Sequence, residues 1–233
     1  FLHRLVLSSH FMREVMFELD KSFFLNSGET FEDNHVFLTG LARSGTTVLL
    51  NAIYQSNQFA SLNYDDMPFI LAPNFWSKLN LVKYHRNPKE RAHGDGIKVS
   101  TNSPEAFEEV FWKTFEDNSQ DCRESFIKFI SLILKKNHRS RYLSKNNQNI
   151  RRLKVISECF PLSKILIPFR DPIQQASSLF SQHKMFIKKQ TEDTFVKDYM
   201  GWIGHSEFGL GYKKIYSNNL QFPDDMLFDH WLE

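Results

Sequence analysis

Residues 43 to 47 combine a permanent cation, three hydroxyls and a glycine in one uninterrupted run. The run reads Arg43, Ser44, Gly45, Thr46 and Thr47. A guanidinium and hydroxyl groups are donors that suit the oxygens of a phosphate or a sulfate. Gly40 and Gly45 bracket four residues, which is the frame of the Walker A motif G-x-x-x-x-G-K-[ST], but Thr46 stands where that motif has its lysine. The run predicts an anion site without the usual metal–nucleotide arrangement. The plainer alternative is a glycine turn ahead of a helix.

A second cation and a second hydroxyl stand about 125 residues further along the chain. Arg170 follows the apolar run 165–169, Asp171-Pro172 turns the chain, and Ser178 lies eight residues after Arg170 in a predicted helix over 173–185. An arginine and a serine at that spacing could hold a second phosphate group. The plainer alternative is an ordinary strand, turn and helix with a structural pair between Arg170 and Asp171.

Transfer of a group to a hydroxyl needs one proton acceptor and one cation near the bridging oxygen. Asp66 is the first candidate for the base and Asp65 the second, because both follow a predicted strand over 59–64. The alternative role for this pair is a helix N-cap ahead of Met67-Pro68. A cap and a base are compatible roles, so both interpretations stay open.

His93 and Lys145 are the remaining catalytic candidates. His93 lies among charged residues and glycines in the stretch 91–96, where it could act as a base in a cleft. A solvated glycine turn explains the same stretch. Lys145 follows a short predicted strand over 142–144 and could face the transferred group or the acceptor, although a surface turn is an equal alternative. His93 and Asp95 have no second cluster at metal-ligand spacing, so we expect no metal site.

Short apolar runs predict the strands that must position these side chains. The runs are 36–38, 59–64, 142–144 and 165–169. Such runs between helical patterns are typical of a parallel sheet in an α/β protein, whose ligands bind at the carboxyl ends of the strands. The predicted helices cover 3–25, 46–53, 104–115, 123–138, 173–185, 190–205 and 224–233.

The run 43–47 resembles the 5′-phosphosulfate-binding loop of the PAPS-dependent sulfotransferases, in which a basic residue precedes Ser-Gly-Thr-Thr. PAPS is 3′-phosphoadenosine-5′-phosphosulfate, the sulfuryl donor. The Arg-Asp-Pro turn at Arg170, followed by Ser178, is similar to the 3′-phosphate motif of the same family. The resemblance covers roughly residues 35–185 and is closest to bacterial sulfotransferases akin to the tyrosylprotein group.

This resemblance implies an α/β, P-loop-type fold of three layers, with a short parallel sheet between helices and a helical cap at 104–138 over the acceptor cleft. The length predicts one domain over 1–233, and the resemblance implies a cofactor-binding core at 35–185. Because the sequence starts at Phe1 and stops within a predicted helix, we expect both ends to be cut. PAPS would be the co-substrate, without a metal. The implied 5′-phosphosulfate ligands are Arg43, Ser44, Gly45, Thr46 and Thr47, the 3′-phosphate ligands are Arg170 and Ser178, and the catalytic set is Asp66, Arg43, His93 and Lys145.

Composition narrows the class of partner. The 29 basic and 27 acidic residues leave a net charge of +2, too balanced for a nucleic-acid-binding protein. No apolar run approaches the roughly 20 residues that span a bilayer. Two cysteines make no disulfide framework, so we expect a cytoplasmic location. The expected partner is a small-molecule, carbohydrate, lipid or peptide hydroxyl acceptor, while its identity and the oligomeric state are not specified by the sequence.

Two other functions compete with sulfuryl transfer. A P-loop kinase or NTPase needs a lysine at position 46 and a carboxylate that holds Mg²⁺, and Thr46 counts against it. A non-catalytic nucleotide-binding fragment would bind without turnover, because the basic loop that sulfotransferases carry near the C-terminus is not found in the sequence. Binding without product formation would identify that second class.

Overall fold

The structure is a computed structural model, and it describes residues 2–26, 32–79, 87–116 and 120–213. The helix predicted over 224–233 lies outside the described residues. At its centre is a parallel sheet of four strands, β1 (Val36–Leu38), β2 (Phe59–Ala60), β5 (Arg141–Lys145) and β6 (Lys164–Leu166), in the order β2-β5-β1-β6. The order and direction confirm the predicted α/β class.

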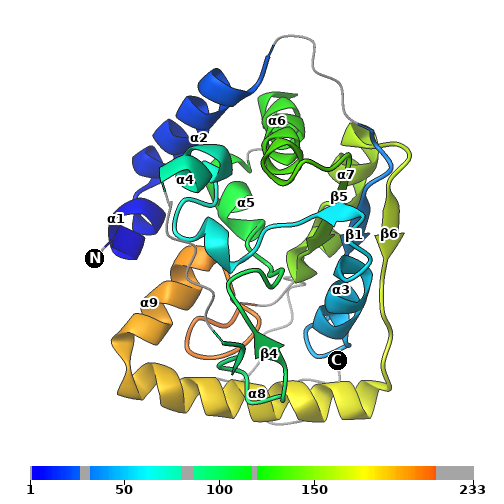
Figure 1. The fold of residues 1–233 in the computed structure, drawn as a ribbon. Helices are drawn as coiled ribbons and strands as arrows, with labels where there is room; N and C mark the ends of the chain where they lie inside the picture. Colours follow the sequence, from blue (N-terminus) through cyan, green and yellow to red (C-terminus); the bar gives the residue numbers. More distant parts are fainter. Residues whose placement is uncertain (1, 27–31, 80–86, 117–119, 214–233) are drawn as a thin grey trace.

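Alternation along the strands divides the core into two faces. Phe37 and Tyr142 point into the larger cluster, whereas Val36, Leu38 and Leu143 belong to the smaller one. Successive side chains of a strand point to opposite faces, so both faces of this sheet are apolar and both are covered. Helix α3 (Thr46–Tyr54) packs on the smaller cluster through Leu50. The result is three layers, helix–sheet–helix (Figure 1).

The larger face is covered by several helices. They are α2 (His10–Phe24), α4 (Pro73–Leu79), α5 (Glu109–Phe115), α6 (Gln120–Asn137) and α7 (Leu153–Cys159). Phe111, Phe126 and Phe129 from α5 and α6 are fully buried, and the Phe111 ring stacks on Phe129 and packs at a tilt against Phe126. These aromatic rings fill the core, and the role of 104–138 as a cap over an acceptor cleft stays a prediction.

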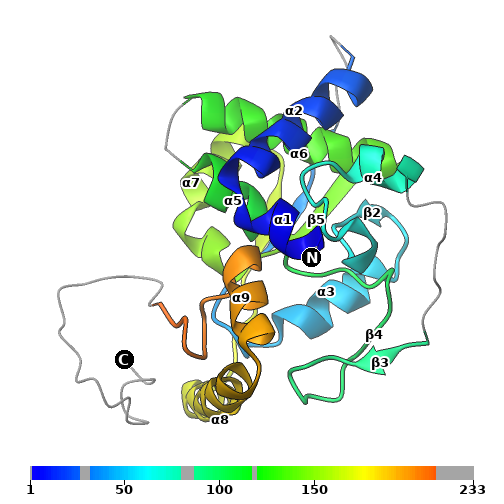
Figure 2. The same cartoon turned by 90° about the vertical axis from the view of Figure 1, so that its left-hand side faces the viewer.

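A third group of elements lies at the carboxyl end of the sheet. The long helix α8 (Pro172–Glu192) runs across this end, and α9 (Thr194–Ile203) packs against it (Figures 1 and 2). A small hairpin, β3 (Lys89–Glu90) and β4 (Lys98–Val99), lies on the same side. A separate apolar cluster of Ala42, Leu179, Phe186, Met200 and Phe208 joins these elements to the loop after β1.

Several predicted boundaries were wrong for identifiable reasons. The first helix divides into α1 (Leu2–Ser8) and α2 because Ser9 leaves the helical conformation and caps α2. The predicted helix from residue 104 begins only at Glu109, since Pro104 forms a β-bridge with Asn63. The strand predicted over 165–169 ends at Leu166, and Ile167 and Phe169 beyond it are exposed. The predicted helix over 190–205 is two helices, because Asp193 caps α9.

Two short 3-10 helices remain to be named among the described residues. They are η1 (Tyr64–Asp66) and η2 (Asn147–Arg151). The strand predicted over 59–64 ends at Ala60, because Asn63 caps η1 with its side chain. None of the described helices is long and apolar enough to cross a membrane.

Candidate functional site

The loop between β1 and α3 has a backbone that needs glycine at two positions. Gly40 has φ 131° and Gly45 has φ 95°, both in the left-handed region that side chains disfavour. Arg43 adopts φ 71° without being a glycine. Gly45 is the N-cap of α3 and offers no side-chain cap, so the first turn of α3 keeps N–H groups without an intrahelical partner. The loop is therefore built as an anion-binding turn, and the helix dipole supports it.

The two motifs that are far apart in the sequence meet here. The Nε of Arg43 donates a hydrogen bond of 3.0 Å to the Oγ of Ser178. The Nη1 of Arg170 donates to the Arg43 carbonyl at 3.4 Å, and the side chain of Gln175 donates to the Ala42 carbonyl at 2.6 Å. The predicted 5′-phosphosulfate loop and the predicted 3′-phosphate pair thus border one site. Their roles as ligands stay predictions.

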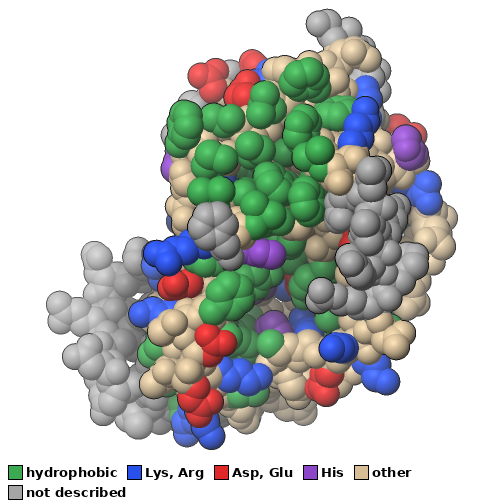
Figure 3. Space-filling view, turned by 60° about the vertical axis from the view of Figure 1, so that its left-hand side comes forward, with side chains coloured by type: hydrophobic (Ala, Val, Ile, Leu, Met, Phe, Trp, Pro, Cys, Tyr) green, Lys and Arg blue, Asp and Glu red, His purple; other side chains and the backbone are tan. Residues whose placement is uncertain are grey.

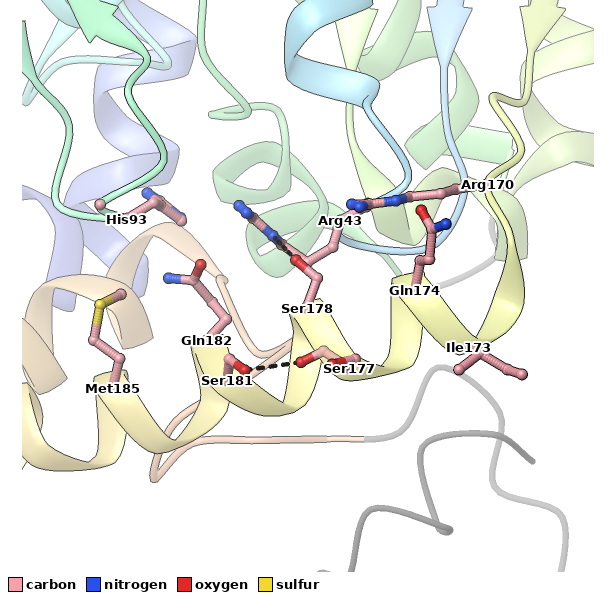
Figure 4. A pocket seen from close by; sticks show the side chains of 11 residues that line it. Arg43, His93, Arg170, Ile173, Gln174, Ser177, Ser178, Ser181, Gln182 and Met185 are labelled. Carbon is pink, nitrogen blue, oxygen red and sulfur yellow. Dashed lines mark hydrogen bonds between the residues drawn. The ribbon is translucent and has the colours of Figure 1, made fainter.

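A cavity of about 640 Å³ follows helix α8 beside this loop. Arg43 and Arg170 lie at one end, and His93 and Met185 lie at the other (Figure 4). The side chains of α8 between these ends are mostly hydroxyls and amides, namely Gln174, Ser177, Ser178, Ser181 and Gln182. A ligand with anionic groups at one end and neutral polar groups along its length fits this lining.

The loop of the β3–β4 hairpin places the carboxylate of Asp95 beside Arg43, at the cationic end of the cavity. Asp95 accepts hydrogen bonds from Arg43 at 2.9 Å and from Arg91 at 3.0 and 2.5 Å. Burial alone would raise the pKa of Asp95, but the bonds from Arg91 and Arg43 outweigh it and hold that pKa well below its usual range. Nη1 of Arg91 also donates to the Thr47 hydroxyl at 3.4 Å. Two guanidiniums and one carboxylate therefore surround the first turn of α3.

His93 is half-buried and lines the cavity. Its ring packs against Phe186 at 5.3 Å and Phe208 at 5.6 Å between centroids. Burial, followed by the charge of Arg91, lowers the pKa of His93 to about 3, so the imidazole is neutral at pH 7. The Nδ1 atom is buried without a hydrogen-bond partner among the described residues. Its position fits the prediction of a cleft residue, and its role as a base stays untested.

Asp66 is almost fully buried and both of its oxygens are used. Oδ2 accepts the backbone N–H of Asn63 at 2.9 Å, which completes a capping box on η1. Oδ1 accepts from the Lys136 ammonium at 2.6 Å, and Asp66 is 1% exposed. The alternative of a helix cap is therefore present in the structure. Asp65 is half-buried, and its backbone carbonyl accepts a hydrogen bond from Trp76 at 2.9 Å.

Lys145 ends strand β5 at the carboxyl edge of the sheet, in register with Leu38 of β1. It is 8% exposed, and its ammonium makes no hydrogen bond or ion pair with another described residue. Glu105 lies close enough that the charge of Lys145 is the largest favourable influence on its ionisation. Burial opposes that ionisation, but Lys145 and His205 lower the pKa of Glu105 to about 2.

A buried carboxylate fixes the strand that delivers Lys145. Glu108 is 1% exposed and accepts hydrogen bonds from the Tyr142 hydroxyl at 3.1 Å and the Ser144 hydroxyl at 2.5 Å. Trp112 at 3.0 Å and Asn149 at 2.7 Å donate to its other oxygen. Buried polar groups of this kind rigidify a core when every member is paired. Glu108 therefore holds the end of β5 and the start of α5 in one arrangement.

The segment after α9 closes the site from another side. Gly204 and Gly209 have φ 78° and 83°, and a Cβ on either would lie within 2.5 Å of a neighbouring side chain. Gly209 donates its N–H to His183 at 3.1 Å, and Phe208 packs on His93. Close packing against these neighbours therefore requires glycine at both positions.

Three site residues were missed by sequence reasoning. Gln175 had no signal beyond its place in a helix. Arg91 stands in the glycine-rich stretch that pointed to His93, but the stretch gave no sign that its arginine reaches Thr47. Glu105 lies at the start of the helix predicted over 104–115, so the sequence indicated a structural role for it. Pro104 instead forms a β-bridge with Asn63.

The fold and the site together define an α/β protein with an anion-binding loop after its central strand and a second arginine-serine pair after the neighbouring strand. The model for the sulfotransferase family matches residues 35–229. The chain belongs to the sulfotransferase family.

Two solved structures resemble this chain, and the first of them supports the same fold. Sulfotransferase STF1 from Mycobacterium tuberculosis H37Rv matches with a TM-score of 0.53 and 12% sequence identity, over 77% of this chain and 57% of that one. Sulfotransferase STF9 from Mycobacterium avium matches with a TM-score of 0.48 and 12% identity, over 84% of this chain and 59% of that one. The chain thus spans less than two thirds of either structure. No curated protein matched significantly.

Proposed function

We propose that the protein transfers the sulfuryl group of PAPS to a hydroxyl acceptor by in-line displacement. The observation that carries the proposal is the 3.0 Å hydrogen bond between Arg43 and Ser178, because it joins the two phosphate motifs across 135 residues of sequence. Membership of the sulfotransferase family supports the same reaction class. The donor site in this proposal consists of Arg43, Ser44, Gly45, Thr46, Thr47, Arg170 and Ser178.

In sulfuryl transfer the bridging oxygen of the donor gains negative charge, and cations or hydrogen-bond donors must stabilise that charge. Arg43 and the N–H groups at the start of α3 supply it in our proposal, and Lys145 supplies a further cation at the end of the adjacent strand. Asp66 and His93 are the proton acceptors expected from the sequence. Asp66 has both oxygens engaged and His93 has a pKa of about 3, so neither is well placed to take a proton without rearrangement.

The proposal extends to the surroundings of the reaction. The domain would extend over 1–233 with its donor-binding core at 35–185, and the acceptor would be a small molecule, carbohydrate, lipid or peptide that carries a hydroxyl. Neither Cys122 nor Cys159 is in a disulfide bond, which supports a reducing, cytoplasmic location. The described residues hold no group of three or more histidine, cysteine, aspartate or glutamate side chains that could bind a metal ion.

Calorimetric titration tests the donor. The purified protein is titrated with adenosine 3′,5′-bisphosphate (PAP), the desulfated product, and in parallel with ATP and Mg²⁺. Binding of PAP supports the proposal, and release of PAP from PAPS in the presence of a panel of hydroxyl acceptors extends it to turnover. Binding of ATP with Mg²⁺ but not of PAP would instead favour a kinase or NTPase. Binding of PAP with no turnover would identify a non-catalytic domain.

A further inference from the structure

A carboxylate of the protein is bound to the arginine that should receive the donor. Nη1 of Arg43, in the loop after β1, donates to Oδ2 of Asp95 at 2.9 Å. The same carboxylate accepts hydrogen bonds from Nε and Nη2 of Arg91, at 3.0 and 2.5 Å. Arginine offers the same forked set of donors to a phosphate or a sulfate. Asp95 therefore has the charge and the shape of the anion that we expect in this loop.

The charges beside the first turn of α3 are balanced by the protein's own side chains. Arg91 lies 3.9 Å from Glu105 in addition to its bonds with Asp95, so the guanidiniums of Arg43 and Arg91 are matched by two carboxylates. Charges are mixed across this part of the molecule, because the lower half of Figure 3, where α8, α9 and the hairpin lie, shows acidic and basic side chains interspersed. Withdrawal of Asp95 would leave two guanidiniums against Glu105, and would thus favour the entry of an anion.

The backbone around Asp95 can change without detaching the hairpin. Gly94 and Gly96 flank Asp95, with φ 62° and 74°, and glycine adopts positive and negative φ about equally. A Cβ on Gly96 would meet no described atom within 4 Å apart from its chain neighbours, so there is room on that side of the hairpin tip. Ala92 is held separately, because its carbonyl accepts the ammonium of Lys189 on α8. Asp95 could therefore leave the arginines while the hairpin stays attached to α8.

We propose that Asp95 is an internal counter-anion of the donor site, which pairs with Arg43 until the 5′ anionic group of the donor replaces it. The inference rests on the proposed sulfuryl transfer, because that proposal assigns the 5′ group to Arg43. In the exchange the salt bridges of Asp95 break, and oxygens of the ligand accept from the same guanidiniums. The binding of the donor is thereby coupled to the position of the hairpin tip, which also carries His93 at the cavity.

Calorimetry on Asp95→Asn and Glu90→Gln tests the exchange. Asparagine keeps the shape of Asp95 and removes its charge. Glu90 is an exposed carboxylate on strand β3 of the same hairpin, so Glu90→Gln is the matched control. The probes are PAP and adenosine 5′-phosphate, which carry a 5′-phosphate, and adenosine 3′-phosphate, which carries none. We expect Asp95→Asn to bind the first two about tenfold more tightly, because charge-assisted hydrogen bonds no longer have to be broken.

The controls limit the explanation to the exchange. The affinity of Asp95→Asn for adenosine 3′-phosphate should change by less than about twofold, because salt screens the remaining long-range effect. Weaker binding of PAP by Asp95→Asn would overturn the inference, since Asp95 would then position Arg43 for the ligand. Unchanged affinity for PAP would also overturn it, as would an equal gain for adenosine 3′-phosphate or in Glu90→Gln. Thermal melting checks the folding of each variant, and Asp95→Ala, with the same expected gain, takes the place of Asp95→Asn if that variant does not fold.

Titration with inorganic pyrophosphate separates this inference from the proposed function. Pyrophosphate has no adenosine, so its binding depends on the anion-binding loop and not on the identity of the donor. Failure of the wild type and of both variants to bind PAP would refute the proposed function. The pyrophosphate titration would still decide the exchange, because a gain of about tenfold in Asp95→Asn supports it and the lack of any gain refutes it.

Discussion

Replacing Arg170 by alanine is expected to weaken the binding of PAP about tenfold and to leave the binding of adenosine 5′-phosphate unchanged. The two ligands differ by the 3′-phosphate, which is the group that we assign to Arg170 and Ser178. Arg170 is exposed, and among the described residues it donates one long hydrogen bond, of 3.4 Å to the Arg43 carbonyl. Its guanidinium therefore keeps most of its five donors for a ligand.

The magnitude follows from the exposure of Arg170. A hydrogen bond to a charged group contributes about 1.5–3 kcal/mol, and solvent screening places an exposed arginine at the lower end of that range. A loss of about 1.4 kcal/mol is a tenfold change in Kd. The effect on folding should be small, because only the 3.4 Å bond is lost. Arg170→Lys should recover part of the affinity, since a lysine keeps the charge but not the fork.

Calorimetry with both ligands on the wild type and on Arg170→Ala gives a cycle that isolates the 3′-phosphate. Lys188→Ala is the matched control, because Lys188 is a 79% exposed cation on α8, the helix that follows Arg170, and its partner is Glu192. Equal weakening of both ligands by Arg170→Ala would refute the assignment, as would an equal effect of Lys188→Ala. Equal weakening of both ligands would mean that the 3′-phosphate binds elsewhere. An equal effect of Lys188→Ala would mean that the loss of affinity comes from the change in net charge.

Other predictions concern stability, measured as the free energy of unfolding in urea. Gly204→Ala should lower the free energy of unfolding by about 1–2 kcal/mol, because φ is 78° and the new Cβ would lie 2.3 Å from Cγ of Glu109. Gly201→Ala, in the interior of α9, should raise it by about 0.5–1 kcal/mol. Equal changes in the two variants would contradict this reasoning. Burial lowers the pKa of His35 to about 4, so the unfolded state binds the proton more readily and stability should fall by about 3 kcal/mol between pH 6.5 and 4, a dependence that His35→Gln should flatten. Glu108→Ala should cost at least about 3 kcal/mol, because four buried donors lose their acceptor; a loss below 1 kcal/mol would show that water replaces it.

The strand–loop–helix units at 36–53 and 164–192 could be predicted from the sequence because their signals are local. Three consecutive apolar residues, glycines at the turns and Pro172 at a helix start each act within a few residues. The pairing of Arg43 with Ser178 could be expected only through a resemblance that ties the two motifs to one ligand. The strand ends were less predictable, since the competing caps at Asn63 and Asp193 depend on the geometry that the chain reaches after the strand or helix.

The surroundings of Arg91 and Glu105 were less predictable, because these residues meet their partners through long-range contacts. Arg91 reaches Thr47 across 44 residues, and Tyr64 reaches Glu105 across 41 residues. No period, cap or turn in the sequence marks such partners. Asp66 attracted attention because carboxylates after a strand are conspicuous, yet the capping box that accounts for its burial uses the same residue.

The order of the strands explains how one edge of the sheet could serve both substrates. Strands β1 and β6 are neighbours, and the segments that follow them hold Arg43 and Arg170. Strands β5 and β2 are neighbours on the other side of β1. Lys145 ends β5, and Leu62, whose carbonyl accepts the backbone N–H of Glu105, follows β2. In the proposed reaction the donor would lie on the half of the edge formed by β1 and β6. Arg91 marks the border with the other half, because its Nη1 donates to the Thr47 hydroxyl and lies 3.9 Å from Glu105.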